Sequence, residues 1–264
     1  MRKKFEIGKR YKIIGIILTV YLIGFFLIFG LSNVKDGKRK LTLLVGDNTF
    51  WRYSDKSWLN ITTKETINSL NWQKYKVYLD NKYFGEYSLW YDDSKWYAFK
   101  SDKSAVIMEG DLLAYSSNFD LDIKEFEIKE NTNNTYVHQV LAKNELPTSS
   151  QMTINSVVKV DIDNDGIEEE IYTISNAFAS DFYPDKLFSI AFMVKDEQIY
   201  SMYTNIEEAS FGNGCKPYVR AILDINEDKT YEVILTCGKF SIQKQEDMLF
   251  KLNKEKFDLL ISNQ

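Results

Sequence analysis

One acidic segment near the middle of the chain constrains the fold more than any other feature. Residues 161–166 read DIDNDG, which places side-chain oxygens at alternate positions with glycine at the sixth, and Glu169 follows at the ninth. Such a loop wraps a hard cation with carboxylates and one backbone carbonyl. A helix–loop–helix calcium site needs a glutamate at the twelfth position, which here is Tyr172. Because the flanking residues are β-branched and aromatic, we expect a β-hairpin around this loop.

A second copy of the pattern lies 63 residues further along the chain. At this shift Asp224, Asn226, Asp228 and Glu232 align with the oxygen-bearing positions of the first loop, and residues of the following strand align as well. Agreement at a single offset indicates an internal repeat. The second copy is weaker, because Lys229 replaces the glycine and an asparagine replaces one carboxylate. The ligand charge therefore falls from −4 to −3.

An Asp-rich hairpin of the form D-x-D-x-D-G-x-x-[DE], followed by an apolar strand and repeated, resembles the FG-GAP/VCBS repeats of β-propellers and related bacterial surface proteins. The resemblance covers residues 157–175 and 220–238 and implies bound calcium. Two repeats cannot close a propeller of four or more blades, so either the sheet is open, as in a partial propeller, or the Trp-rich block described below supplies further strands. The implied ligands are Asp161, Asp163, Asp165, the Ile167 carbonyl and Glu169, then Asp224, Asn226, Asp228, the Thr230 carbonyl and Glu232.

Solvated acidic turns without an ion are the alternative for both loops, because Asp-Gly is favoured in tight turns anyway. Extracellular calcium modules bind at ~0.1–1 mM. At ~1 mM ion, a site with Kd ~0.1 mM stabilises a fold by roughly 1.4 kcal/mol. We therefore expect structural calcium rather than a calcium switch, in the first loop before the second.

An uncharged apolar stretch at residues 13–31 predicts one membrane-spanning helix. Nineteen helical residues span roughly 28 Å, close to the hydrocarbon thickness of a bilayer. A cleaved signal peptide fits less well, because its apolar run is usually ~7–15 residues and no A-x-A-like site follows here. A buried soluble helix is the third reading. Six Lys/Arg precede the stretch and four follow it, which favours a cytoplasmic tail at 1–12 and an extracytoplasmic body.

The distribution of charge agrees with an anchored protein. Residues 1–40 carry a net charge of +8, whereas the other 224 residues carry 23 basic and 36 acidic groups, a net charge of −13. A basic end on an acidic body argues against nucleic acid as a partner. A single histidine, His138, leaves almost no room for Ser-His-Asp or histidine–zinc chemistry, and we expect it to be structural or exposed.

Two β blocks are expected beyond a basic linker at residues 32–40. All five tryptophans lie in residues 41–146 and none in 151–264. The boundary is placed at 147–150, where the sequence PTSS interrupts the apolar pattern. Short alternating segments separated by Asp, Asn and Gly turns predict antiparallel strands, so the fold class is mainly β.

Alternation also predicts individual elements. In the first block we expect a hairpin from strands 75–79 and 83–91, a strand at 96–99 and alternation over 120–128. A capping box at Thr62 and Glu65 predicts a helix over 63–70, while residues 137–141 fit a strand or a helix. In the second block the expected strands are 156–160, 169–174, 187–194, 198–203, 219–223, 232–235, 248–252 and 257–260.

Two weaker signals leave alternatives open. Cys215 and Cys237 flank the second acidic hairpin, and they form either a disulfide or two buried free thiols. The aromatic side chains of the first block form either a core or a platform on which sugars stack, and we expect a core.

Together these features predict a bacterial single-pass membrane protein with an extracytoplasmic, calcium-supported β domain for binding or scaffolding, and no enzymatic activity. The expected partners are the lipid bilayer, through residues 13–31, and another envelope protein or a cell-wall component. A sensor or accessory subunit of an envelope complex is the alternative. An envelope hydrolase using Glu168–Glu170 is less favoured, because adjacent strand residues point to opposite faces.

Overall fold

The computed structural model describes residues 40–264 except 93–94, 101–103, 109, 132–133, 149–153, 178–184, 209–213, 240–243, 255 and 264. Leu41–Gln264 form one compact unit whose sheets are antiparallel, which confirms the mainly-β expectation. The predicted membrane helix at 13–31 lies outside the described residues. Within the described part of the chain, no helix is long and apolar enough to cross a membrane.

Sheet A contains the first eight strands, in the order β3-β2-β1-β8-β4-β5-β6-β7. One short helix, α2 (Lys64–Asn68), links β3 to β4. Thr63 caps α2 by accepting a hydrogen bond from the backbone of Thr66, so the expected cap at Thr62 is wrong by one residue. The strands are β1 (Leu41–Val45), β2 (Thr49–Ser54), β3 (Ser57–Asn60), β4 (Lys74–Leu79), β5 (Lys82–Asp92), β6 (Lys95–Phe99), β7 (Ala105–Ile107) and β8 (Leu112–Ser116).

Sheets C and B are each built on a four-stranded meander. Sheet C comprises β11 (Ile154–Val160), β12 (Glu169–Ser175), β13 (Lys186–Lys195) and β14 (Gln198–Glu208). Sheet B comprises β15 (Cys215–Asp224), β16 (Glu232–Lys239), β17 (Lys244–Asn253) and β18 (Lys256–Ser262). All eight strands expected in the second block lie within these observed strands.

A short extended segment adds one edge strand to each meander. The strand β9 (Asp122–Ile123) pairs with β15, and β10 (Lys129–Glu130) pairs with β11. The helix α3 (Thr135–Lys143) follows and packs on sheet C, which resolves the open choice at 137–141 as a helix. The chain therefore leaves sheet A near residue 117, earlier than the block boundary expected at 147–150. The alternation over 120–128 yields only the two residues of β9 as strand.

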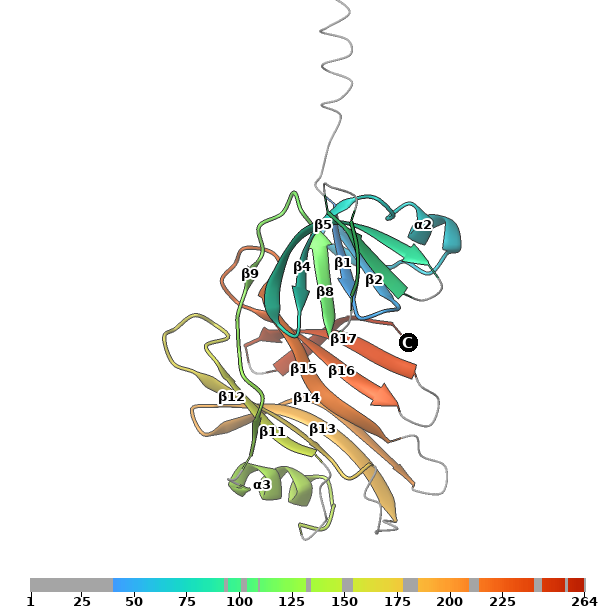
Figure 1. Cartoon of the computed structure of the whole chain (residues 1–264). Coiled ribbons are helices and arrows are strands. Elements are labelled where there is room, and N and C mark those ends of the chain that lie inside the picture. Colours follow the sequence, from blue (N-terminus) through green and yellow to red (C-terminus); the bar gives the residue numbers. More distant parts are fainter. Residues whose placement is uncertain are drawn as a thin grey trace, which may run out of the picture. The chain divides into compact units, whose positions relative to one another are not determined.

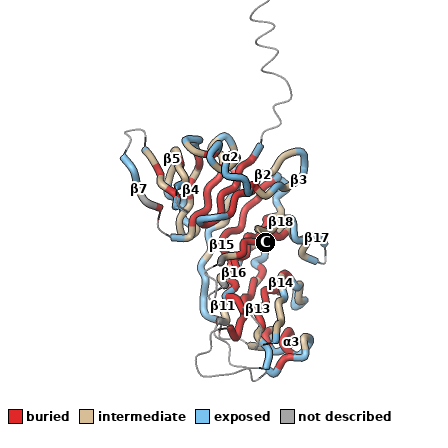
Figure 2. The backbone as a smooth tube through the Cα atoms, turned by 90° about the vertical axis from the view of Figure 1, so that its right-hand side faces the viewer, coloured by how far each residue is buried: buried red, intermediate tan, exposed pale blue. Residues whose placement is uncertain are grey.

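The three sheets are stacked with sheet B in the middle (Figure 1). One core, which includes Ile171 and Met193 of sheet C and Val233 and Phe250 of sheet B, lies between those two sheets. A second core joins the other face of sheet B to sheet A. Because sheet B is covered on both faces, β16 is buried over successive residues rather than at alternate ones (Figure 2).

A buried polar cluster also joins sheet A to sheet B. Thr49 of β2 and Thr236 of β16 each donate a hydrogen bond of 2.6 Å to the carboxylate of Asp247. Arg220 donates to Thr236 at 2.8 Å and forms an ion pair of 3.1 Å with Asp111, which lies just before β8. Burial raises the pKa of Asp247, although the guanidinium of Arg220 opposes the rise. These contacts hold sheets A and B together at this position.

Candidate cation sites in the two acidic hairpins

Both acidic loops connect the first and second strands of a meander. The first loop joins β11 to β12, and the second joins β15 to β16. Neither loop is embedded in a helix, as the flanking residues predicted. The two sites are therefore equivalent positions of one repeated supersecondary unit.

The first loop is folded around its own carboxylates. Asp161 accepts hydrogen bonds from the backbone nitrogens of Asp165 and Gly166 at 3.1 and 3.0 Å. Asp165 accepts one from Ile167 at 2.9 Å, and Glu169 accepts one from the nitrogen of Ile162 at 2.8 Å. The φ of Gly166 is +89°, a conformation that favours glycine. The loop geometry thus explains the sixth-position glycine.

The second loop repeats these contacts at the aligned positions. Asp224 accepts from the backbone nitrogens of Asp228 and Lys229 at 3.2 and 2.9 Å. Asp228 accepts from Thr230 at 2.9 Å, and Glu232 accepts from Ile225 at 2.9 Å. Lys229 adopts the left-handed conformation at φ +66° in place of glycine. Each of these hydrogen bonds therefore corresponds to one in the first loop, 63 residues earlier in the chain.

The two loops touch each other. The backbone nitrogen of Tyr231, which follows the second loop, donates to the carbonyl of Ile162 in the first loop at 2.8 Å. The hydroxyl of Tyr231 donates to Asp122 of β9, and Lys124 lies over its ring at 4.4 Å. The acidic loops thus lie at the same end of the stacked sheets B and C and are joined directly.

A lysine ammonium lies among the carboxylates of each loop. The Nζ of Lys195 is 2.5 Å from Asp163, 2.7 Å from Asp165 and 3.0 Å from Glu169. In the second loop, the Nζ of Lys251 is 2.6 Å from Asp228 and 3.0 Å from Glu232. Each loop therefore holds a positive charge that the protein itself supplies.

The two lysines occupy equivalent positions in the repeat. Lys251 of β17 pairs with Glu232 of β16. Val194 of β13 pairs with Glu170 of β12, which places Lys195 opposite Glu169. The sequence pattern of the loops did not reveal these residues. The signal that would have found them is a lysine on the third strand, in register with the ninth-position glutamate of the loop.

The charged groups of the first loop shift one another's pKa values. Burial raises the pKa of Glu169, although the backbone nitrogen of Ile162 and the ammonium of Lys195 oppose the rise. Hydrogen bonding to Lys195, and then to the nitrogen of Ile167, lowers the pKa of Asp165. Burial lowers the pKa of Lys195, but its three carboxylate partners outweigh burial and raise it. Lys195 is therefore firmly held in its charged form.

The second loop shows the same directions. Burial raises the pKa of Glu232, opposed by the nitrogen of Ile225 and by Lys251. Burial acts to raise the pKa of Asp228, but hydrogen bonds from Lys251 and the nitrogen of Thr230 lower it. For Lys251, burial acts to lower the pKa and the carboxylates of Asp228 and Glu232 raise it. The two loops therefore match in the directions of their pKa shifts as well as in their hydrogen bonds.

The donor atoms of the first loop suit a divalent cation. Carboxylate oxygens of Asp161, Asp163 and Glu169 lie within 4.8 Å of one another. The Oδ1 atom of Asp163 is buried and has no hydrogen-bond partner among the described residues. Buried polar atoms are normally satisfied, so this oxygen has capacity for an additional ligand. Asp165, the carbonyl of Ile167 and Lys195 complete the surroundings, and an ion there competes with the Lys195 ammonium.

The second loop suits a divalent cation less well. The side-chain amide of Asn226 donates to Asp228 at 3.1 Å. Lys251 contacts Asp228 and Glu232. Among the described residues, no carboxylate oxygen of this loop is both buried and unpaired. The replacement of a carboxylate by Asn226 thus leaves the loop satisfied by groups of the protein itself.

A disulfide lies beside the second hairpin. Cys215 of β15 and Cys237 of β16 are bonded, with their Cα atoms 5.4 Å apart. Both cysteines are fully buried in the core between sheets B and C. The choice that the sequence left open, between a disulfide and two free thiols, is therefore a disulfide in the structure.

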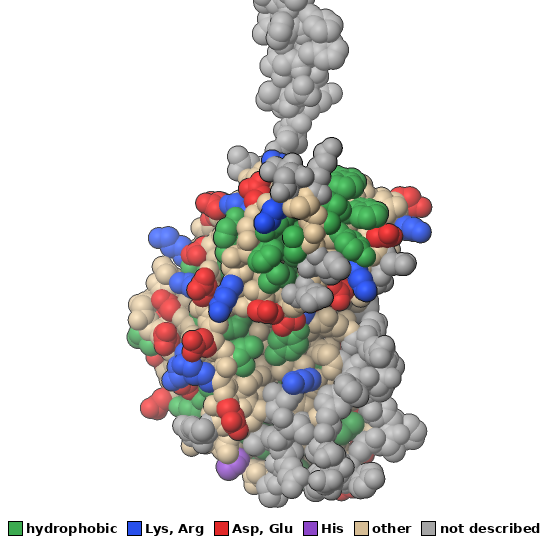
Figure 3. Space-filling model, in the orientation of Figure 1, with side chains coloured by type: hydrophobic (Ala, Val, Ile, Leu, Met, Phe, Trp, Pro, Cys, Tyr) green, Lys and Arg blue, Asp and Glu red, His purple; other side chains and the backbone are tan. Residues whose placement is uncertain are grey.

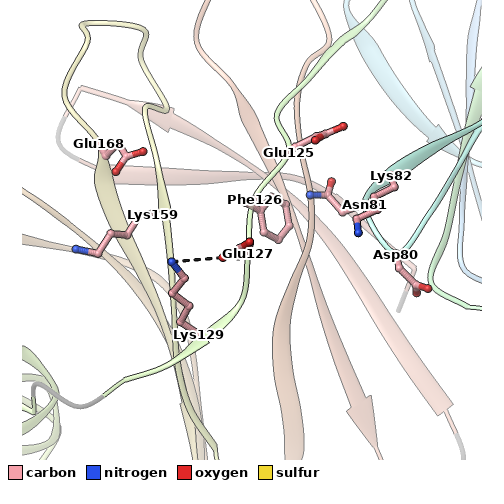
Figure 4. Close-up of a pocket in the computed structure, with 9 residues that line it drawn as sticks. All are labelled: Asp80, Asn81, Lys82, Glu125, Phe126, Glu127, Lys129, Lys159 and Glu168. Atoms are coloured by element: carbon pink, nitrogen blue, oxygen red, sulfur yellow. Dashed lines mark ion pairs between the residues drawn. The ribbon is translucent and has the colours of Figure 1, made fainter.

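A groove of about 410 Å³ lies near the first loop (Figure 4). Its walls come from the β4–β5 turn, from the β9–β10 segment and from the start of the first hairpin. Positive and negative side chains alternate around it, and Glu127 pairs with Lys129 at 3.4 Å. The lining residues are Asp80, Asn81, Lys82, Glu125, Phe126, Glu127, Lys129, Lys159 and Glu168.

The structure separates the three glutamates considered for a hydrolase. Glu168 lines the groove, Glu169 is buried beneath the first loop, and Glu170 pairs with Lys159 at 2.6 Å. Only Glu168 of the three lines this groove, so it does not form a carboxylate pair there with either neighbour.

Comparison with known proteins returned no match: no family model, no curated protein and no solved structure matches the chain.

Proposed function

We propose that this chain is a single-pass, membrane-anchored extracytoplasmic binding or scaffold protein of the FG-GAP/VCBS type, with a structural calcium ion in its first acidic hairpin. The observation that carries the proposal is the duplicated loop, in which the first copy retains a buried, unpaired oxygen at Asp163. The second copy, satisfied by Lys251 and Asn226, keeps the same shape without needing a metal.

Calcium fits the chemistry of the first loop. Its side-chain donors are all carboxylates, and calcium prefers six to eight oxygen ligands. Asp161, Asp163, Asp165, the Ile167 carbonyl and Glu169 would hold the ion. Four carboxylates against one lysine leave this loop with a net charge of −3, which a divalent ion neutralises better than an ammonium group. The role is structural, since both loops already hold their hydrogen-bonded form.

The extracytoplasmic location is supported by two independent features. The uncharged stretch at 13–31 has the length of a membrane span, and Lys/Arg residues are more numerous before it than after it. Cys215 and Cys237 form a disulfide, a bond that persists in oxidising compartments and is rare in the cytosol. The acidic body and its β sheets accordingly belong outside the cytoplasm.

A binding or scaffolding role accounts for the acidic loops better than catalysis does. The carboxylates of the loops are occupied by backbone nitrogens and lysines, so they serve the architecture of the hairpins. The mixed charges of the groove suit a polar partner, such as another envelope protein or a cell-wall component. A role as accessory subunit of an envelope complex is compatible with the same features.

The test is thermal unfolding of the full chain in mild detergent, with calcium and with EDTA. At ~1 mM calcium and Kd ~0.1 mM, we expect EDTA to remove roughly 1.4 kcal/mol, which lowers Tm by about 3–6 °C for a domain of this size. The double variant Asp161→Ala/Asp165→Ala should lose this response, and the matched variant Asp224→Ala/Asp228→Ala should keep it. A melt of the wild-type chain that is indifferent to EDTA would contradict the proposal.

A further inference from the structure

Aromatic side chains cluster on a part of sheet A that sheet B does not cover. The two indole rings of Trp72 and Trp90 are 6.1 Å apart and nearly parallel, at 11°. Phe99 lies 4.9 Å from Trp72, and Tyr97 lies 5.7 Å from Trp90. We call these four residues the aromatic surface. Figure 3 shows hydrophobic side chains gathered over the sheet A end of the molecule.

The aromatic surface continues a face that is buried elsewhere. On β1 and β8 this face carries Leu43 and Tyr115, which pack in the core against sheet B. On β5 and β6 it carries Trp90 and Phe99, which are only half-buried, while their strand neighbours Leu89 and Ala98 point to the opposite, buried face. Trp72 is 60% exposed and is held in a left-handed conformation at φ +66°. Both the exposure and the backbone conformation of Trp72 are uncommon for a bulky aromatic residue and need an explanation.

The chain enters sheet A at the same end. Strands β1 and β4 both pair with β8. The two registers place Leu41 and Lys74, the first residues of β1 and β4, at the same height along the sheet. Lys74 pairs with Ser88 of β5, which pairs with Phe99 of β6. From β1 to β6 there are four strand steps of about 4.8 Å, or roughly 19 Å. The aromatic surface thus lies on the rim of the sheet where the tether is attached.

The tether is short. Nine residues, 32–40, separate the predicted membrane helix from Leu41. At ~3.3–3.6 Å per residue they reach about 30 Å at most. The end of sheet A that carries the aromatic surface is therefore never far from a lipid surface when the chain is anchored.

Positive charge accompanies the aromatic rings. A hollow of about 330 Å³ next to Phe99 is lined by Lys74 and Lys100, with Glu86 as its acidic residue. These lysines belong to a body whose net charge is −13, so a local excess of positive charge is unusual for it. Tryptophan and tyrosine favour the membrane–water interface, and lysines near an anionic leaflet contribute about 1 kcal/mol each.

We infer that the aromatic surface docks on the lipid headgroup region of the membrane in which the chain is anchored, with Lys74 and Lys100 contacting anionic lipids. This inference rests on the proposed anchor. It assigns sheet A an orienting role, which leaves the groove near the first acidic loop for other partners.

Tryptophan fluorescence tests this inference directly, because all five tryptophans lie in sheet A or in its connections and none lies in residues 13–31. The full chain is placed in nanodiscs that contain anionic lipid, with or without bromine on the acyl chains near the headgroup. We expect brominated lipid to quench the emission. Trp72→Phe/Trp90→Phe should remove most of the quenching, and Lys74→Glu/Lys100→Glu should weaken it.

The matched control is Trp58→Phe, on the edge strand β3 at the other side of sheet A. This variant should keep the quenching. An inserted chain that shows no quenching, or quenching that survives in Trp72→Phe/Trp90→Phe, would overturn the inference and leave the anchor standing. A chain that fails to insert into nanodiscs overturns the anchor and the inference together. Burial of Trp72 by a second copy of the chain or by an added cell-wall oligosaccharide, without lipid quenching, would also overturn it.

Discussion

Lys195 and Lys251 are the residues that distinguish these hairpins from simple acidic turns. Each contacts the ninth-position glutamate of its loop at 3.0 Å, and that glutamate is almost fully buried. A buried carboxylate without a partner is costly, and removing one member of a buried pair leaves the other uncompensated. The lysines therefore act as counter-ions that hold each loop closed when no metal is bound.

Replacing either lysine by methionine should destabilise the fold by about 1–3 kcal/mol, less than a fully buried pair because both ammonium groups are partly exposed. In Lys195→Met, calcium loses its competitor, so the rise in Tm between EDTA and calcium should be larger than in the wild-type chain. In Lys251→Met, EDTA should have no more effect than in the wild-type chain. Thermal unfolding with and without calcium measures all of these.

Lys256→Met is the control for this pair, because Lys256 is 72% exposed in its contact with Asp258. It should change stability by no more than ~0.5 kcal/mol. Equal effects of all three substitutions, or a smaller calcium response in Lys195→Met, would contradict the role of the lysines as internal counter-ions.

The β15–β16 pair is linked to its surroundings in several ways. It carries the disulfide Cys215–Cys237, the second acidic loop, and the residues Arg220 and Thr236 of the polar cluster that joins sheet A. Because sheet B has a core on each face, a loosening of this pair propagates to both neighbouring sheets.

Loss of the disulfide should therefore be costly. The two cysteines are 22 residues apart, and closing a loop of that size stabilises a fold by about 3 kcal/mol in the chain-entropy model. Cys215→Ala/Cys237→Ala should lower Tm by about 6–12 °C, and a reductant should lower the Tm of the wild-type chain but not of the variant. A wild-type chain with two alkylatable thiols under denaturing, non-reducing conditions would contradict the disulfide.

The sequence predicted which residues form strands better than it predicted which strands pair with each other. Short apolar segments bounded by Asp, Asn and Gly turns located every strand of the two meanders. The sequence pattern missed β1–β3, β7 and β8 of sheet A; in β1 and β8 successive residues are buried, so no alternation results. It also suggested a longer strand over 120–128 than β9, because that segment bridges two sheets and pairs with each only briefly.

The candidate site was also predictable only in part. Spacing alone gave the loop carboxylates and their repeat, since those residues are neighbours in sequence. Lys195 and Lys251 were not found, because they come from the third strand of each meander and reach the loops only through strand pairing. The sequence also left open whether the aromatic surface is buried. Periodicity shows that Trp90 and Leu89 point to opposite faces, but it does not show which face a neighbouring sheet covers.

At the scale of the whole molecule, the described strands form a stack of three sheets. Sheets B and C each carry an acidic loop in the same place, while sheet A packs on the other face of sheet B. The helix α3 covers the outer face of sheet C. The Trp-rich block at 41–146 forms strands as expected, but they make a separate sheet, and only β9 and β10 of its described strands join the two meanders.

The packing of this stack predicts how it responds to alkali. Burial raises the pKa of a set of tyrosines above the ordinary value of ~10. Their folded-state pKa is raised, so their contribution to stability is complete below pH ~10 and is lost as the pH rises further. The tyrosines are Tyr75, Tyr115, Tyr172, Tyr218 and Tyr231.

In an alkaline titration we therefore expect two phases of tyrosinate absorbance. Exposed tyrosines should ionise while the β circular dichroism is unchanged, and the buried set should ionise only as that signal is lost. In denaturant, all tyrosines should ionise in one phase. Complete ionisation with an intact β signal would contradict the burial of these side chains.

The central claim is that the repeat holds one metal ion, in its first loop, and an internal lysine in its second. Calorimetric titration of calcium into the EDTA-stripped full chain tests this most directly. We predict one site per chain with Kd ~0.1–1 mM, retained in Asp224→Ala and abolished in Asp161→Ala. Two sites, no site, or a single site that Asp224→Ala removes would contradict the claim.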